Sequence, residues 1–223
     1  DLLEFEAKSL MAEHGIAAPE EWLVRREDEL AEIAQCRQGK PLAMKVVSKD
    51  ILHKSDAGGV KLNLVGEPPL RDAFQAIHSN AQAYDPNAQI EGVLVTPMAE
   101  KGVEVIIGML RDPIFGPVLM FGLGGIFVEV LEDVAFRSLP LTLHDAQSMV
   151  DQLKAQKVLA GVRGAAGVDK QALVSLLMQV SQLVEAYPEI SELDLNPVIA
   201  YPKGHSAANY AIVDARIIVE RQS

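Results

Sequence analysis

The sequence predicts a mixed α+β (α/β) fold built as two lobes with a ligand cleft between them. Hydrophobic residues make up 49% and charged residues 23% of the 223 residues, which is the composition of a globular chain with a sizeable core. Segments with strand and helix periodicity alternate along the whole chain. A loop with Pro86 and Asn87 separates two groups of them, so we expect an N-terminal lobe at residues 1–88 and a C-terminal lobe at residues 89–223.

The first lobe is expected to combine helices with short apolar strands. Leu3, Ala7 and Met11 recur at helical spacing, and Gly15 stands where a helix commonly ends. The pair Pro68-Pro69 is typical of a first helical turn and opens a longer helix. We therefore expect helices at residues 3–14, 27–37 and 68–84, and strands at residues 22–24, 41–47 and 60–65.

The second lobe begins and ends with extended runs. Between them, Leu173, Leu177 and Val184 mark the apolar face of a long helix, and Asp169 is a candidate N-cap. We expect strands at residues 90–96, 103–110, 118–122, 134–139, 192–200 and 210–219, and helices at residues 144–155 and 169–186.

Charge and hydropathy exclude several functional classes. The chain carries 31 acidic and 20 basic residues, a net charge of −11, so we expect no nucleic-acid partner held by charge. The longest uncharged stretch, residues 113–128, has 16 residues and holds two prolines and four glycines. Because a spanning helix needs about 20 apolar residues, we expect no membrane segment.

The chain ends and the cysteine content bear on the compartment. The N-terminus lacks the basic and apolar regions of a signal peptide, and it lacks an initiator Met, which is typical of a fragment of a longer chain. The single cysteine, Cys36, excludes an intrachain disulfide framework and fits a reducing compartment. We therefore expect a cytoplasmic location.

Two segments of the first lobe could bind phosphate. Lys45 stands inside an apolar strand, where an ammonium group is costly to bury unless an anion neutralises it. The alternative is an edge strand from which the lysine reaches water. The loop at residues 53–59 follows with a histidine, a lysine and two glycines, which let backbone N–H groups approach phosphate oxygens. His53 could act as a nucleophile or acid–base group, or be an ordinary surface residue.

The second lobe offers candidate ligands for phosphate and metal. The segment at residues 122–125, GLGG, is either a phosphate-facing turn or a simple tight turn. Glu192, Asp194 and Asn196 share one face of a strand, and Asp214 lies in the last strand. These oxygen ligands suit Mg²⁺, although a solvated strand face is the alternative. Together with the lysine and the glycine loop, they indicate nucleotide-dependent phosphoryl transfer.

Seven blocks resemble the ATP-grasp β subunit of NDP-forming (ADP-forming) acyl-CoA synthetases of the acetyl-CoA synthetase type. They include MKVVS at residues 44–48, ILHKSDAGGV at residues 51–60 and FGLGGIFVE at residues 121–129, followed by residues 133–137, 161–164, 192–197 and 213–216. Succinyl-CoA synthetase β subunits are similar at a greater distance. The resemblance implies an ATP-grasp fold whose two lobes grip a nucleotide. It also implies a reaction: acyl-CoA, phosphate and ADP form a carboxylic acid, CoA and ATP.

The resemblance also implies a role for each matching position. Lys45 matches the strand lysine on the nucleotide phosphates, and His53 matches a second phosphoryl carrier that attacks as neutral imidazole. The flexible phosphate loop is matched by Lys54, Ser55, Gly58 and Gly59. The hinge that reads adenine is matched by Thr96, Pro97 and Met98, and a nucleotide-binding acid, at the ribose, by Glu104. Asn196 and Asp214 match the pair that binds Mg²⁺.

The same resemblance implies a partner. The CoA-binding α part, with its own phosphorylated histidine, has no counterpart in these residues, so activity is expected with an α subunit or fused domain, in a hetero- or homo-oligomer. One alternative is a non-catalytic regulatory domain of an acyl-CoA-dependent protein acetyltransferase. Another is an ATP-grasp carboxylate–amine ligase, against which the His53 block argues, because that chemistry needs no phosphohistidine.

Overall fold

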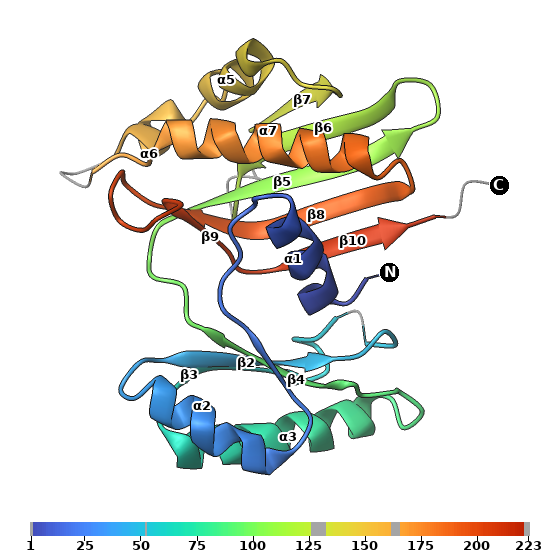
Figure 1. Ribbon diagram of the computed structural model, residues 1–223, viewed down its shortest axis with the longest axis vertical. Coiled ribbons are helices and arrows are strands. Elements are labelled where there is room, and N and C mark those ends of the chain that lie inside the picture. Colours follow the sequence, from blue (N-terminus) through green and yellow to red (C-terminus); the bar gives the residue numbers. More distant parts are fainter. Residues whose placement is uncertain (1, 52, 126–132, 162–165, 221–223) are drawn as a thin grey trace. The chain divides into compact units, whose positions relative to one another are not determined.

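The computed structural model describes all residues except 1, 52, 126–132, 162–165 and 221–223. The chain divides into two compact units (Figure 1). The smaller unit is Pro19–Met98, and the larger unit joins Asp1–Ala18 to Ala99–Ser223. Among the described residues, no helix has both the length and the hydropathy needed to cross a membrane.

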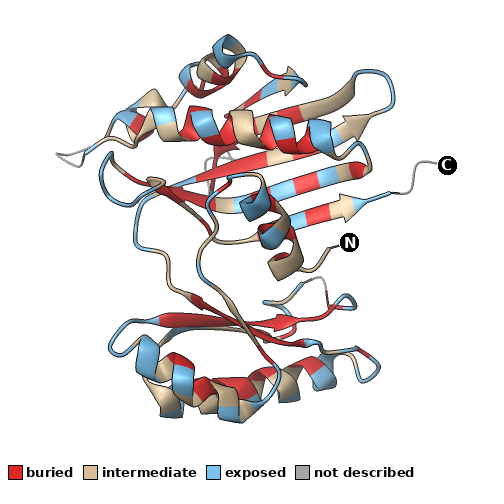
Figure 2. Cartoon of the chain, in the orientation of Figure 1, coloured by how far each residue is buried: buried red, intermediate tan, exposed pale blue. Residues whose placement is uncertain are grey.

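The smaller unit is a four-stranded antiparallel sheet covered on one face by helices (Figure 1). Its strands, in spatial order, are β1 (Trp22–Val24), β4 (Gly92–Pro97), β2 (Leu42–Val47) and β3 (Val60–Leu64). The helices are η1 (Glu27–Glu29), α2 (Leu30–Cys36) and α3 (Glu67–Tyr84). Met44 and Val46 of β2 pack with Leu70 and Ile77 of α3 in the buried core. Figure 2 shows buried residues in red on both the strands and the helices of this unit.

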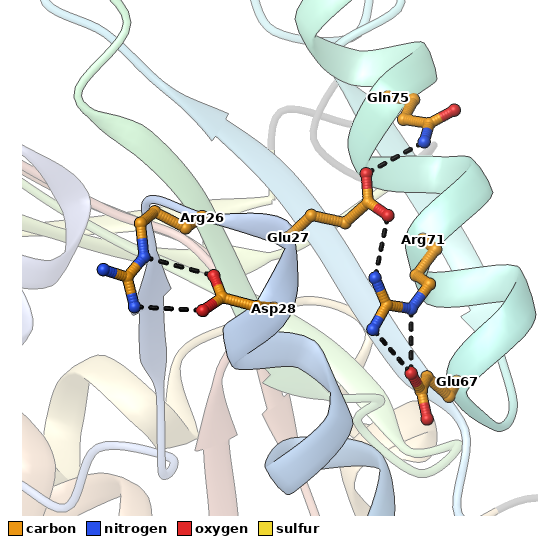
Figure 3. A network of polar contacts seen from close by, with 6 residues as sticks. All are labelled: Arg26, Glu27, Asp28, Glu67, Arg71 and Gln75. Atoms are coloured by element: carbon orange, nitrogen blue, oxygen red, sulfur yellow. Dashed lines mark hydrogen bonds and ion pairs between the residues drawn. The ribbon is translucent and has the colours of Figure 1, made fainter.

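Charged side chains tie η1 to α3 on the surface of the smaller unit (Figure 3). Arg71 donates to Glu67 Oε1 through Nε and to Glu27 Oε1 through Nη1, both at 2.8 Å. Gln75 donates to the other oxygen of Glu27 at 2.9 Å. The hydrogen bonds from Gln75 and Arg71 lower the pKa of Glu27. Because these groups are partly open to water, the network contributes little stability and mainly fixes where the segment lies.

The larger unit contains a six-stranded antiparallel sheet (Figure 1). Its main path runs β10 (Ala215–Val219), β8 (Ile190–Ala200), β5 (Val103–Asp112), β6 (Gly116–Leu123) and β7 (Val134–Ser138), and β9 (Tyr210–Ile212) pairs with β8. One face is covered by α5 (Leu143–Asp151), α6 (Gln156–Ala160) and α7 (Lys170–Ala186), while α1 (Glu4–Glu13) packs against β10. The core lies between sheet and helices.

Several local predictions are confirmed in the larger unit. Asp169 caps α7, because its Oδ1 accepts from the N–H groups of Gln171 and Ala172 at 3.1 and 3.2 Å. Gly15 follows α1 with a φ of 78°, a conformation that favours glycine.

Asp133, which is 2% exposed, accepts from the N–H groups of Lys154 and Ala155 at 2.6 and 2.8 Å. This buried carboxylate therefore ties the start of β7 to the connection between α5 and α6.

The observed units differ from the expected division at residue 88. The first helix belongs to the larger unit, where Ala7 and Met11 join the core and Leu2 donates to Ile217 O at 2.9 Å. The strand after residue 88, β4, belongs to the smaller unit because it pairs with β1 and β2. Hydrophobic periodicity predicts that a segment is a helix or a strand, but not which sheet it joins. The loop at Pro86 therefore connects α3 and β4, which belong to the same unit.

Two expected elements are divided in the structure. The helix expected at residues 144–155 ends at Asp151, and α6 begins only at Gln156. The strand expected at residues 210–219 is divided into β9 and β10, with residues 213 and 214 between them. Asp214 therefore lies in a connection beside β8, and not within a strand.

His78 of α3 makes the stability of the smaller unit depend on pH. Its Nε2 is buried and has no hydrogen-bond partner among the described residues, and its ring lies 4.5 Å from that of Phe74. Burial lowers the pKa of His78 below its ordinary value of 6.5. The unfolded chain therefore takes up this proton at a higher pH than the folded chain, and stability is lost as pH falls below the ordinary value.

We predict that His78→Leu removes this part of the pH dependence. The melting temperature of the wild type should fall between about pH 7.5 and about pH 5.5, and that of the variant should fall less. His144→Leu, at an exposed position of α5, is the control and should keep the wild-type slope. Equal slopes for all three proteins, measured by circular dichroism, would contradict the prediction.

Candidate functional site

Lys45 lies on an inner strand of the smaller unit. Strand β2 has β4 on one side and β3 on the other, which excludes the alternative of an edge-strand lysine. Met44 and Val46 point into the core, so Lys45 points to the opposite face, and it is only 7% exposed. The pairing of Ala43 with Thr96 places Thr96 on the same face as Lys45. A buried ammonium group and a buried hydroxyl therefore share one face of this sheet.

The glycine loop is attached to the strand that carries Lys45. Val46 N donates to Gly59 O at 2.7 Å. Within the loop, the N–H groups of Ala57, Gly58 and Gly59 donate to the carbonyls of His53, Ser55 and Lys54 at 3.2, 3.0 and 2.8 Å. The glycines therefore shape the turns, and their own N–H groups are engaged in this conformation. Lys54 and Ser55 remain the phosphate candidates of the loop, and His53 is exposed beside them.

Asn80 holds the loop from α3. Its Nδ2 donates to Gly58 O at 3.1 Å. Gly58 has a φ of 61°, and a Cβ at that position would lie 2.8 Å from Asn80 Nδ2. The sequence analysis missed Asn80, because an asparagine inside an amphipathic helix carries no signal of a contact with a loop 22 residues away.

The predicted hinge residues lie where the chain leaves the smaller unit. Thr96 and Pro97 end β4, and the unit itself ends at Met98. Met98 N donates to Pro41 O at 3.0 Å, and Pro97 pairs with Leu42. This segment is therefore fixed to β2 up to the last residue of the unit.

In the larger unit, Glu104 is in contact with the GLGG turn. The carbonyl of Glu104 accepts from Gly124 N at 2.7 Å. A Cβ at Gly124 would approach Glu104 Cβ to 2.9 Å, and one at Gly125 would lie 3.4 Å from Glu104 Oε2. The turn therefore packs against the exposed carboxylate of Glu104. The remainder of the predicted block, residues 126–129, and residues 162–164 lie outside the described residues.

The proposed metal ligands are neighbours in the larger unit. Asn196 N donates to Asp214 O at 3.2 Å, which places the two residues side by side at the junction of β8, β9 and β10. Asp194 of β8 and Arg216 of β10 lie opposite each other in the β8–β10 pairing, two residues from Asn196 and Asp214 respectively. Partial desolvation and the charge of Asp214 raise the pKa of Asp194, whereas Arg216 lowers it. Arg216 belongs to a block that the sequence analysis quoted, but no role was assigned to it.

The donor set fits Mg²⁺ better than a metal held by protein side chains alone. Among the described residues, no group of three or more His, Cys, Asp and Glu side chains is placed to hold a metal ion. An Asn–Asp oxygen pair is suited to Mg²⁺, which keeps waters and takes further ligands from substrate phosphates. The neighbouring charge of Asp194 also favours a cation at this position.

A pocket of about 600 Å³, lined at one end by Asp194 and Arg216, lies on the sheet face that turns away from α7. One row across the sheet lines it, consisting of Arg216, Asp194, Gly108, Met120 and Phe136. Gly108 supplies no side chain in the middle of this row, and a Cβ there would lie 3.2 Å from Met120 Cε. The pocket therefore has a charged end at β8 and β10, with acidic and basic side chains, and an apolar end at β7.

The predicted site residues are thus brought together in two sets. One set lies in the smaller unit and contains Lys45, His53, Lys54, Ser55, Gly58, Gly59, Thr96, Pro97 and Met98. The other lies in the larger unit and contains Glu104, Asn196 and Asp214. Each set is held by the sheet of its own unit.

Comparison with known proteins finds relatives over nearly the whole chain. The ATP-grasp domain family matches residues 1–219. The β subunit of ADP-forming acetate–CoA ligase II from Pyrococcus furiosus is 47% identical over 220 residues, which cover 98% of this chain and 92% of that subunit. The longer ADP-forming acetate–CoA ligase I from Archaeoglobus fulgidus is 46% identical, and the match covers 96% of this chain and 30% of that protein. A succinate–CoA ligase β subunit from Vibrio atlanticus is 25% identical over 99% of this chain and 56% of that subunit, at the predicted greater distance.

Solved structures also match this chain over nearly its whole length. Acetyl-coenzyme A synthetase 1 from Ca. Korarchaeum cryptofilum, in complex with coenzyme A, Ca-AMPCP and HgCl⁺, is 46% identical with a TM-score of 0.91, covering 98% of this chain and 93% of that chain. The same protein with coenzyme A and Mg-AMPPCP, its phosphohistidine segment pointing towards the nucleotide binding site, is 43% identical with a TM-score of 0.81, covering 98% and 92%. The predicted fold and family resemblance are confirmed.

The packing of Gly59 against β2 gives a stability prediction. A Cβ at this position would lie 2.5 Å from Val46 Cγ1 and 3.1 Å from Lys54 O. Gly59→Ala should therefore lower the free energy of unfolding by about 1–3 kcal/mol, measured by urea denaturation. In the double variant with Val46→Ala the methyl clash is gone, so the loss should be smaller than the sum of the two single losses. Strict additivity would show that the loop does not depend on this close approach.

Proposed function

Because the chain belongs to the ATP-grasp domain family, we propose that it is the nucleotide-binding β component of an ADP-forming acetyl-CoA synthetase. In this reaction acyl-CoA, phosphate and ADP give a carboxylic acid, CoA and ATP, and the enzyme is an acid–thiol ligase. The identity to β subunits over almost their full length supports the assignment. The observation that carries it is the buried Lys45 on an inner strand, with the loop of His53 bonded to the same strand.

Lys45 is assigned to the nucleotide phosphates. Its ammonium group lies in the sheet, where water competes poorly for an anion and a charge-assisted hydrogen bond is strong. Lys54 and Ser55 extend this phosphate site along the loop. Gly58 and Gly59 set the turns that present the two side chains, since their own N–H groups are engaged within the loop.

The hinge segment is assigned to the adenine base and Glu104 to the ribose. Pro97 has no N–H group, and the N–H group of Met98 donates to Pro41. Recognition of adenine is therefore assigned to backbone carbonyls of Thr96, Pro97 and Met98, which can accept from the exocyclic amino group. Glu104 suits a ribose hydroxyl, because its exposed carboxylate accepts hydrogen bonds and is fixed by the GLGG turn.

His53 is assigned as the phosphoryl carrier. Its neutral ring attacks the phosphorus of a phosphohistidine on the CoA-binding partner, and the new N–P bond forms as the old one breaks. The phosphorylated His53 ring gives up its N–H proton to solvent, and the donor ring takes one up. An oxygen of the ADP β-phosphate then attacks, giving ATP and releasing His53. Asn196 and Asp214 would hold Mg²⁺, which when bound neutralises phosphate charge. The exposure of His53 supports this role, because the ring must be reachable from a partner.

The partner is assigned as a CoA-binding α subunit or a fused domain of the same enzyme. Some relatives are named β subunits, and another is a longer protein of which this chain covers 30%. The larger unit exposes apolar side chains beside its pocket, with Ile114 85% and Phe115 70% exposed in the β5–β6 turn. The exposed single cysteine, Cys36, fits a reducing compartment and supports a cytoplasmic location.

We predict separate effects of Lys45 and His53. Lys45→Met should weaken ADP binding by about 10- to 100-fold, because a charge-assisted hydrogen bond to phosphate is lost. His53→Asn should leave ADP binding within about twofold, because the ring acts as carrier and not as anchor. Calorimetric titration with ADP and Mg²⁺ measures both. Lys40→Met, at an exposed position before β2, is the matched control.

The carrier role has its own measurement in the same variants. Incubation with γ-labelled ATP, Mg²⁺ and the CoA-binding partner should leave an acid-labile phosphoryl label on this chain. The label should be absent from His53→Asn and present in His144→Asn, which alters an exposed histidine of α5. Label retained in His53→Asn would refute the carrier role, and unchanged ADP affinity in Lys45→Met would refute the phosphate role.

A further inference from the structure

Helix α1 carries a buried ion pair on the side that faces the sheet. Lys8 Nζ lies 2.9 Å from Glu4 Oε1, and both side chains are 3% exposed. Burying two charges is expensive, and an ion pair recovers that cost only with good geometry and further hydrogen bonds. An apolar pair of similar size would attach the helix equally well.

Other contacts also attach α1 to the larger unit. Ala7 and Met11 place the helix in the core of the larger unit, and Leu2 N donates to Ile217 O at 2.9 Å. Gln179 of α7 also donates to Gly15 O at 2.8 Å, at the other end of the helix. The ion pair therefore calls for a further explanation.

Lys8 reaches the connection that carries Asp214. Its Nζ donates to Val213 O at 3.2 Å, directly before Asp214 in the chain. Val213 N donates to Pro197 O at 3.0 Å, and Asp214 O accepts from Asn196 N at 3.2 Å. The connection between β9 and β10 is thus held by β8 on one side and by the ammonium group of Lys8 on another.

We propose that Lys8, itself held by Glu4, is a positioning residue for the Asn196–Asp214 cation site. The inference deepens the proposed function and rests on it. The ammonium group fixes the Val213 carbonyl, and with it the peptide unit that sets the direction of the Asp214 side chain. Asp214 Oδ1 also accepts from Ala215 N at 3.0 Å, so the carboxylate is oriented from both sides in the chain. Partners that orient metal ligands in this way commonly determine metal affinity.

The test compares two variants that share one substitution. Glu4→Gln removes the negative charge beside Lys8 and is expected to lower stability, but its amide oxygen can still accept from Lys8, so we expect the bond from Lys8 to Val213 O to be retained. The double variant Glu4→Gln with Lys8→Met removes that bond without leaving an unpaired buried charge. Calorimetric titration with ADP over a series of Mg²⁺ concentrations gives the Mg²⁺ concentration for half-maximal enhancement of ADP affinity.

We expect the double variant to need about tenfold more Mg²⁺ than Glu4→Gln, the low end of the range for partners of metal ligands. Glu4→Gln should stay within about twofold of the wild type, and ADP affinity without Mg²⁺ should be equal in all three. Asp133→Asn is a structural control in the same unit and should lower the melting temperature without changing the Mg²⁺ requirement. Equal Mg²⁺ requirements in Glu4→Gln and the double variant would overturn the inference.

Two further outcomes are distinguishable. If the double variant does not fold, Lys8→Arg takes its place in the test. Its guanidinium group keeps the ion pair with Glu4 but does not place a donor at the position of Nζ. A wild-type Mg²⁺ requirement in Lys8→Arg would overturn the inference. If ADP binding of the wild type does not respond to Mg²⁺, the metal role of Asn196 and Asp214 is overturned and this inference with it. If Lys45→Met binds ADP as tightly as the wild type, the proposed phosphate site is overturned, but the inference about Lys8 is not affected.

Discussion

The alternation of side chains along β8 is the constraint on which the larger unit depends. Leu193 and Leu195 enter the core, while Asp194 and Asn196 between and beside them stay on the exposed face. Because successive side chains point to opposite faces, a slip of one residue would bury Asp194 and Asn196 and expose the leucines. The register with β5 and β10 is therefore fixed by hydrophobic burial, and the candidate metal site is placed by that same register.

Buried lysines show how each unit supports its part of the site. Lys45 lies on a sheet whose other face is packed by helices, so the strand cannot rotate to expose it without losing Met44 and Val46 from the core. Lys8 is held by a carboxylate one helical turn away and by a backbone carbonyl. In both cases an ammonium group is buried, at a cost in free energy, next to proposed ligand-binding residues. A lysine buried at such a position is more readily explained by a role in ligand binding than by stability alone.

The sequence predicted those features that depend on residues close together in the chain. The alternation of β8, the Asp169 cap and the glycine loop each depend on neighbours within a few residues, and all could be read from the chain. The contacts of Asn80 with Gly58 and of Lys8 with Val213 join residues 22 and 205 positions apart, and no periodicity reports them. The same reason explains the boundary at residue 88, because the pairing of β4 with β2 and the packing of α1 on β10 are decided by tertiary contacts.

The path of the chain divides the proposed chemistry. The chain enters the smaller unit after Ala18 and leaves it at Met98, so this unit is an insertion between α1 and β5. Lys45 and Thr96 lie on one sheet, to which the His53 loop is bonded, and Asn196 lies on the other, with Asp214 in a connection beside it; each sheet has its own core. Each set keeps its internal geometry through its own hydrophobic packing. A substitution in one core is therefore expected to disturb the proposed phosphate contacts or the proposed metal contacts, but not both, so we expect ADP affinity and Mg²⁺ dependence to respond separately to substitutions in the two units.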